Sequence, residues 1–235
     1  MIELEIAVTG AAGARVAADG GADRVELCSA LELGGVTPSQ PLIEATVAVG
    51  LPVHVLVRCR PGDFCYDAEE IALMAAEVRA AVAAGAAGVV IGALTDAGEL
   101  DRTAIRRLAD ATDGRVEITL HRAIDQAADP VAAAAQVPAL GLTRILTSGG
   151  AAGAAAGADT IARMAAADIQ VMAGGGVRPA DIPALAATGI AAVHLSAKKP
   201  APRRATRVPL GADTHFVTDP ETVAAARRAV DDLPR

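Results

Sequence analysis

The sequence predicts a closed (β/α)8 barrel, the TIM-barrel fold, built as one domain over residues 1–235. Eight short β-branched runs alternate with Ala-rich helical stretches, and glycines mark the ends of several of these stretches. The length of 235 residues also suits one such barrel, which typically takes about 250 residues. The eight expected strands are residues 2–8, 24–28, 53–58, 89–92, 117–121, 144–147, 170–173 and 192–196.

The stretches between the expected strands have room for crossover helices. Those with the clearest helical composition are residues 68–84, 103–111 and 130–139. A glycine precedes several strands, where it would tolerate the left-handed backbone just past a helix end. These glycines are Gly21, Gly85, Gly141 and Gly189. An open Rossmann-type sheet is the alternative, but residues 9–14 (TGAAGA) lack the GxGxxG pattern that it needs after its first strand.

Two later segments depart from this alternation. Residues 151–158 form a low-complexity Ala/Gly stretch, which we expect to be a mobile loop. Residues 198–235 follow the barrel as a basic, Pro-rich linker and a terminal helix. The linker, residues 198–207, is expected to be flexible and solvated. The helix is expected over residues 219–233, with Asp219 as its N-cap and Pro220 at its first position.

Composition and charge exclude several classes of function. The formal net charge is −7 and aromatic residues make up only 1%, which argues against binding of nucleic acid through phosphates or base stacking. The N-terminus has no basic segment followed by an apolar one, and the uncharged stretch 80–94 is shorter than the about 20 residues that span a bilayer. Three cysteines without CxxC spacing indicate free thiols. We therefore expect a cytoplasmic protein with no membrane partner.

Charged side chains recur at the expected carboxyl ends of the strands, where parallel barrels carry their active sites. Glu26, Arg58, His121 and His194 come from four different strands, and buried charge at such positions is costly unless it has a use. We take these four as candidate catalytic residues. A purely structural ion pair remains the alternative for Glu26 with Arg58, and a structural role is favoured for His54 near the start of its strand.

Two glycine-rich turns predict an anion site in the same mouth. They follow the sixth and seventh strands, and consecutive glycines let backbone N–H groups converge on a phosphate. The candidate anion-binding residues are Arg60, Ser148, Gly149, Gly174, Gly175, Gly176 and Ser196. Gly175→Val is expected to block this site while sparing the fold.

The motifs along the chain resemble those of the CutC family, known as copper homeostasis proteins. The matching segments are residues 20–28 (GGADRVELC), 34–39 (GGVTPS), 58–64 (RCRPGDF), 92–95 (GALT), 121–125 (HRAID), 144–149 (RILTSG), 174–177 (GGGV) and 194–197 (HLSA). The resemblance runs in order from residue 2 to 197. It implies a cytoplasmic, oligomeric barrel that binds or handles copper.

The resemblance makes Cys28 the candidate ligand for Cu(I), an ion that prefers thiolates. The family often has a cysteine in its first strand where this chain has Ala7, and Cys59 has the strand parity that faces the helices. A multi-thiolate copper centre is therefore expected to be weak or absent. Two hypotheses follow: a copper-handling protein, and alternatively an enzyme acting on a small anionic or phosphorylated metabolite.

Overall fold

Eight parallel strands close into a barrel in which β1 pairs with both β2 and β8. The structure is a computed structural model that describes residues 2–201 and 215–234. The strands are β1 Glu3–Val8, β2 Arg24–Leu27, β3 Val53–Leu56, β4 Gly88–Ile91, β5 Glu117–Leu120, β6 Arg144–Thr147, β7 Gln170–Gly174 and β8 Ala192–Leu195. Every strand end lies within two residues of its predicted position. The fold prediction is confirmed.

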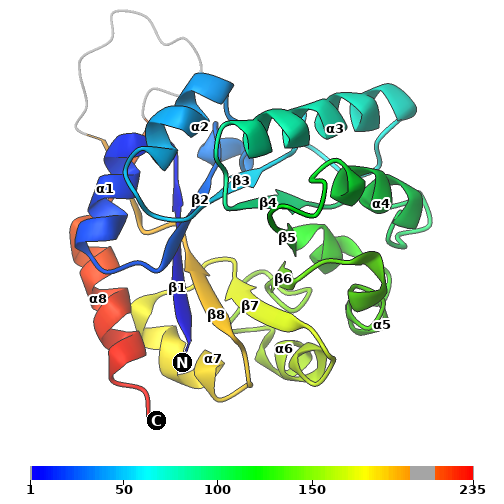
Figure 1. The fold of residues 1–235 in the computed structure, drawn as a ribbon. Coiled ribbons are helices and arrows are strands. Elements are labelled where there is room, and N and C mark those ends of the chain that lie inside the picture. Colours follow the sequence, from blue (N-terminus) through cyan, green and yellow to red (C-terminus); the bar gives the residue numbers. More distant parts are fainter. Residues whose placement is uncertain (1, 202–214, 235) are drawn as a thin grey trace, which may run out of the picture.

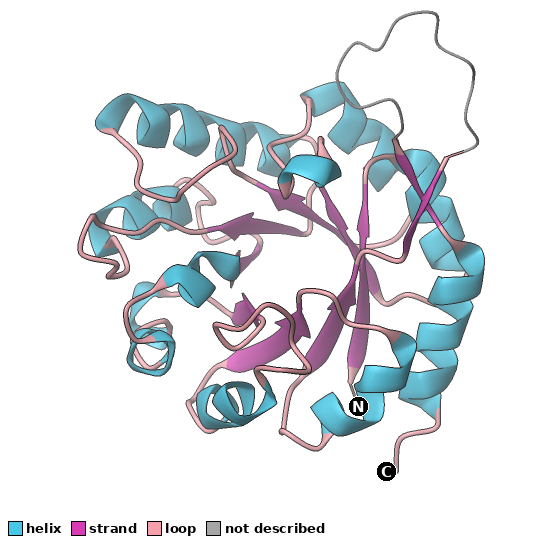
Figure 2. Cartoon of the chain, turned by 180° about the vertical axis from the view of Figure 1, so that it is seen from behind, coloured by secondary structure: helices cyan, strands magenta, loops and turns pink. Residues whose placement is uncertain are grey.

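Helices follow the strands and cover the outside of the barrel (Figures 1 and 2). They are α1 Ala11–Asp19, α2 Gln40–Val47, α3 Ala68–Ala83, α4 Arg102–Asp110, α5 Pro130–Ala134, α6 Ala158–Ala165, α7 Ile182–Ala186 and α8 Pro220–Asp231. Within the described part of the chain, no helix is long and apolar enough to span a membrane.

Local sequence signals set the helix boundaries. Asp67 caps α3, because its carboxylate accepts from the N–H of Glu70 and the Glu70 side chain accepts from the N–H of Asp67. Asp219 caps α8, as predicted. The helix expected over 130–139 is wrong in length: α5 ends at Ala134 and a separate 3-10 turn begins at Pro138, which lacks the N–H that a continuing helix would use. The predicted glycines past helix ends all have φ between 78° and 91°.

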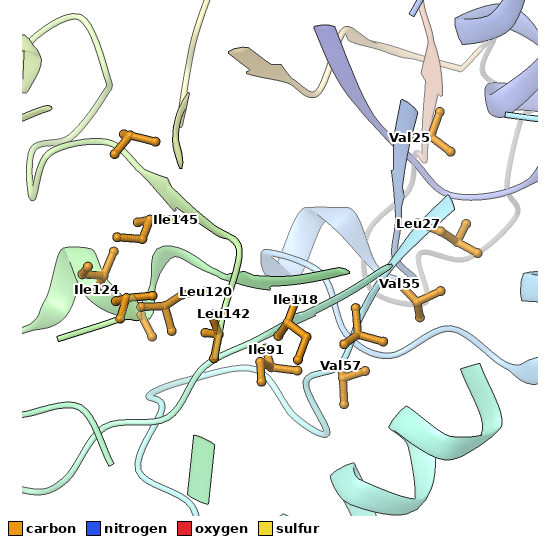
Figure 3. Close-up of a cluster of buried hydrophobic side chains, with 14 of the residues drawn as sticks. Val25, Leu27, Val55, Val57, Ile91, Ile118, Leu120, Ile124, Leu142 and Ile145 are labelled. Atoms are coloured by element: carbon orange, nitrogen blue, oxygen red, sulfur yellow. The ribbon is translucent and has the colours of Figure 1, made fainter. Parts of the chain in front are cut away.

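Alternate residues of each strand face opposite sides, so the barrel has two cores. The outward residues pack under the helices, and Figure 3 shows part of this layer, including Val25, Leu27, Val55 and Ile145. The inward layer is smaller and contains two apolar clusters, one of Cys28, Leu56 and Val90, the other of Leu146, Met172 and Ala192. Polar inward residues occupy the space between these clusters.

The amino-terminal half of the barrel interior is filled by charged side chains. Arg24 binds the carboxylates of Glu3 and Glu5, and Arg144 donates to Glu117 at 3.1 Å and to Gln170 at 3.0 Å. Because these groups compensate one another, the charges can be buried there. The open space of the barrel lies at the opposite, carboxyl end of the strands.

The two segments that depart from the alternation take defined positions where they are described. Residues 151–157 form turns, and Ala154 is buried and donates its N–H to the carbonyl of Gly175 at 2.9 Å. In the linker, β9 Lys198–Pro200 pairs with β10 Phe216–Thr218 in a small antiparallel sheet. The rest of the expected linker, residues 202–207, lies outside the described residues.

Candidate functional site

A cavity of about 210 Å³ opens at the carboxyl ends of the strands. The predicted site residues that line it are Glu26, Arg58, His121, Gly175, Gly176, His194 and Ser196. The four candidate catalytic residues thus come together in one place, although they lie on β2 and β8 and in the segments that follow β3 and β5. Their roles remain predictions at this stage.

Glu26 and His194 form an acid–base pair on one wall of the cavity. Nε2 of His194 lies 3.7 Å from Oε2 of Glu26, and its Nδ1 lies 2.7 Å from Oε1 of Glu5. Glu5 is fully buried on β1, and its other oxygen accepts from Nε of Arg24 at 2.5 Å. His194 therefore lies between two carboxylates, one in the cavity and one beneath it.

Burial and neighbouring charges shift the pKa values of Glu26, His194 and Glu5 in different directions. Burial raises the pKa of Glu26 to about 7, even though the nearby His194 acts to lower it. Burial opposes a charge on His194, but Glu26 and Glu5 together raise the pKa of His194 above its ordinary value. Burial would also raise the pKa of Glu5, yet its bonds to His194 and Arg24 lower it well below the usual range. Glu26 can therefore gain or lose a proton near neutral pH.

Arg58 contributes positive charge that no carboxylate neutralises. Its guanidinium donates to three backbone carbonyls, those of Leu33 at 3.2 Å, Gly35 at 3.0 Å and Gly62 at 2.8 Å, and it lies over the ring of Phe64. Within residues 2–201 and 215–234, no acidic side chain forms an ion pair with it, so the predicted structural pair with Glu26 is not found. Arg58 is 7% exposed, and a buried cation held only by carbonyls suits an anionic ligand.

His121 directly follows β5 and lines the cavity, with the ring of Phe64 in contact with both His121 and Arg58. The backbone N–H of Ala123 donates to its Nδ1 at 3.1 Å, and its ring packs 4.9 Å from that of Phe64. Burial, together with the charge of Arg58, lowers the pKa of His121 to about 3. The ring is therefore neutral at physiological pH.

The turn after β7 exposes backbone N–H groups to the cavity. Gly175 and Gly176 have φ of 102° and 66°, and the N–H groups of Gly175, Gly176 and Val177 have no hydrogen-bond acceptor among the described residues. This is the geometry of an anion-binding turn. The expectation that Gly175→Val spares the fold is wrong, because a Cβ there would lie 3.0 Å from Cζ of Arg122 on a left-handed backbone.

Gly174, which ends β7, contributes in a different way. A Cβ at Gly174 would collide with Leu146 and lie 3.1 Å from Cβ of His194. Its lack of a side chain is thus needed for packing next to the acid–base pair. Ser196 lies at the rim of the cavity, directly after β8.

The turn after β6 is already filled by the protein itself. Asp125 accepts from the N–H of Ser148 at 3.0 Å and of Gly150 at 3.1 Å, and from Oγ1 of Thr147 at 2.5 Å. Neither Ser148 nor Gly149 lines the cavity. The prediction that these two residues hold a ligand anion is corrected here, because a carboxylate of the same chain takes that place.

Arg60 also lies outside the cavity. Its side chain pairs with Glu70 and with Asp63 and lies over the ring of Tyr66. It lies four residues beyond the end of β3 at Leu56, where strand geometry no longer directs its side chain. Arg60 is therefore not part of the anion site in this structure.

Arg122 lines the cavity and was not among the predicted site residues. It donates to Asp125 at 2.8 Å and to Ser148 at 2.8 Å, which fixes a cation 42% exposed at the mouth. Its position directly after His121 at a strand end was the available signal. Phe64 and Val177 complete the apolar part of the lining.

The residues present do not fit a copper centre. Cys28 is buried in the inner apolar cluster, where burial and the Glu26 carboxylate raise the pKa of its thiol far above the ordinary value. Cys59 packs against the outer core, as its parity predicted. In the described ranges, no three His, Cys, Asp or Glu side chains are grouped so as to hold a metal ion.

Comparisons with known proteins agree on one family. The family model described as CutC family matches residues 2–199. A CutC family protein of Agrobacterium fabrum is 46% identical over 77% of this chain and 73% of its own length, and one of Xanthomonas campestris is 44% identical over 84% of each chain. A solved CutC structure from Streptococcus agalactiae, whose name refers to copper homeostasis, has a TM-score of 0.78 at 30% identity and covers 83% of this chain and 99% of its own. The chain belongs to the CutC family.

Proposed function

We propose that this protein is an acid–base enzyme acting on a small anionic metabolite bound in the barrel mouth. One observation carries the proposal: the Glu26–His194 pair lines the same cavity of about 210 Å³ as Arg58, which has no ion-pair partner in the part of the chain that the structure describes. Proton transfer needs a group that titrates near neutral pH, and Glu26 supplies one. Binding of an anion needs positive charge and free donors, which Arg58, Arg122 and the turn after β7 supply.

The position of each charged group in the cavity determines the role that we assign to it. The N–H groups of Gly175 and Gly176, with Arg122 beside Gly175, would hold the anionic group of the substrate, and Arg58 would add positive charge to the cavity. Glu26 would then take or give the proton at the reacting atom. His194, whose pKa is raised by Glu26 and Glu5, lies beside Glu26 and is held in place by Glu5 at 2.7 Å.

Copper handling is the second candidate, and it rests on the name of the Streptococcus agalactiae relative. Cu(I) prefers thiolate and thioether ligands. Cys28 is the only thiol near the cavity within the described residues, and its surroundings disfavour the thiolate form. The donor set thus favours the anion site over a copper site. Strong Cu(I) binding that Cys28→Ser abolishes would reverse this preference.

The test uses two arginines that are two positions apart. Phosphate is titrated into the wild type, Arg58→Gln and Arg60→Gln, while NMR follows the amides of Gly175, Gly176 and Val177. Arg58→Gln is expected to weaken phosphate binding about tenfold or more, the loss of one charge-assisted hydrogen bond. Arg60→Gln is the matched control and should leave the affinity unchanged, because its side chain lies outside the cavity.

Two results would contradict the proposal. One is an absence of shifts at these amides in the wild type at millimolar phosphate. The other is an equal loss of affinity in both variants, since the effect would then come from net charge rather than from the site. Thermal unfolding of each variant shows whether it remains folded under the conditions of the titration.

A further inference from the structure

The tautomer of His121 is fixed by its own backbone. The side chain of His121 caps the 3-10 turn Arg122–Gln126, and the N–H of Ala123 donates to its Nδ1 at 3.1 Å. A nitrogen that accepts a hydrogen bond cannot carry a hydrogen itself. The neutral ring therefore carries its hydrogen on Nε2.

This nitrogen is a hydrogen-bond donor without an acceptor. Nε2 of His121 is buried and has no partner within the described residues, although the ring lines the cavity. Leaving such a donor unpaired costs about 1–3 kcal/mol. The chain also keeps room for the ring, because a Cβ at Gly92 would lie 2.5 Å from its Cε1. A costly donor held in a fixed position beside a cavity points to an acceptor on the ligand.

The same contact prevents His121 from taking up a proton. A second hydrogen would have to go on Nδ1, directly opposite the N–H of Ala123, and Arg58 adds positive charge nearby. His121, a candidate catalytic residue from the sequence, is thus unsuited to act as an acid or a base. What it can do at neutral pH is donate one hydrogen bond from an uncharged ring.

We propose, resting on the proposed acid–base function, that the substrate is a small anion with a carbonyl group, and that the protein catalyses proton transfer at the carbon beside that carbonyl. The carbonyl oxygen accepts from Nε2 of His121, and Glu26 on β2 faces the neighbouring carbon. The anionic group lies toward the turn after β7 and the neighbouring Arg122, and Arg58 adds positive charge to the cavity. Three parts of one cavity thereby recognise three parts of one molecule.

The reaction is balanced without any further reagent. The carboxylate of Glu26 takes the proton from the carbon, and the C–H electron pair forms a C=C bond. The carbonyl π pair moves to oxygen, and the resulting enolate keeps its hydrogen bond to His121, which does not lose its proton. Glu26 then returns a proton to the same carbon, the carbonyl is restored, and Glu26 is a carboxylate again. Donors aimed at an oxygen that gains charge are a major source of catalysis.

The first experiment examines His121 in the full-length protein without a ligand. Its ring nitrogens are followed by ¹⁵N NMR between pH 5 and pH 9. We expect a neutral ring with hydrogen on Nε2 throughout this range. Titration of His121 within it, or hydrogen on Nδ1, would overturn the inference.

The second experiment compares two ligands that share a phosphate. Phosphoglycolohydroxamate imitates an enolate beside a phosphate, whereas glycerol 3-phosphate has the phosphate but no carbonyl. The wild type is expected to bind the hydroxamate at least about tenfold more tightly, as one strong hydrogen bond provides. His121→Phe should abolish this preference while it leaves the binding of glycerol 3-phosphate unchanged, and His121→Gln, which keeps an N–H donor, should restore part of it.

The outcomes separate the inference from the proposed function. Equal binding of the two ligands by the wild type, or a preference that survives in His121→Phe, would refute the carbonyl substrate while the anion site stands. Failure of both ligands to shift any cavity amide would instead refute the anion site itself. If His121→Phe does not fold, the ligand comparison in the wild type and in His121→Gln still decides the question.

Discussion

The carboxylate of Glu26 should destabilise the folded protein at neutral pH, so Glu26→Gln should stabilise it. The pKa of Glu26 rises from 4.5 to about 7 because the side chain is buried. At about 1.4 kcal/mol for each pKa unit, this change amounts to about 3 kcal/mol. The folded protein holds the proton more tightly than the unfolded chain does. The penalty is therefore absent below pH 4.5, grows as the pH rises, and is complete above pH 7.

Removal of Glu26 also takes a partner from His194, which offsets part of the gain. We therefore expect Glu26→Gln to be more stable than the wild type by about 1–3 kcal/mol at pH 8 and equal to it near pH 4.5. Urea unfolding of both proteins at intervals across this range gives the difference directly. Glu44→Gln is the matched control, because it removes one carboxylate from the exposed surface of α2.

The pH dependence of the difference is the decisive part. A gain that is the same at every pH would reflect packing of the amide rather than titration of Glu26. Equal or lower stability of Glu26→Gln at pH 8 would refute the argument that this carboxylate is held in an unfavourable place for its charge.

Four further substitutions test other parts of the site. Glu5→Gln should lower the pKa of His194, as measured by NMR, and an unchanged pKa would contradict the prediction. The same variant should lose about 3–5 kcal/mol of stability in urea unfolding above pH 5, because a buried ion pair loses its anion. Asp125→Asn should cost about 2–4 kcal/mol in the same assay, since two backbone N–H groups lose a charged acceptor. Gly149→Ala should destabilise the protein far more than Gly176→Ala, because only a Cβ at Gly149 would collide with a backbone carbonyl. Gly176→Ala should cost about 1 kcal/mol, and equal melting temperatures of the two variants would argue against the described turns.

The sequence predicts the strands well because each is a short β-branched run that ends in a turn residue. It also places the catalytic candidates correctly at one end, since parallel strands present their carboxyl ends together. What it could not supply is the pairing inside the barrel. Glu26 and Arg58 are plausible partners by charge, yet Glu26 faces His194, because the partner of Glu26 depends on how the strands stagger around the closed sheet.

The glycine turns show a second limit of the sequence. The turns after β6 and β7 look alike in composition, but Asp125 fills the first, and among residues 2–201 and 215–234 no carboxylate fills the second. Asp125 is more than twenty residues from Ser148 in the sequence, and only the closed barrel brings the two together. Arg60 shows a related limit: it lies beyond the end of β3 at Leu56, and strand alternation does not predict where its side chain points there.

The carboxylate of Asp125, in the turn after β5, accepts hydrogen bonds from the turn after β6, so the two turns form one structural unit. Arg122 reaches across the same junction to Ser148, so its charge at the mouth is positioned by both turns together. A chimaera that exchanges one of these turns alone with a relative would leave a buried carboxylate or two backbone N–H groups without their partners. Recombination and loop grafting in this barrel should therefore exchange both turns together, and they should keep Gly175 of the turn after β7, because a Cβ there would lie 3.0 Å from Cζ of Arg122 and 3.1 Å from Cβ of Ser148.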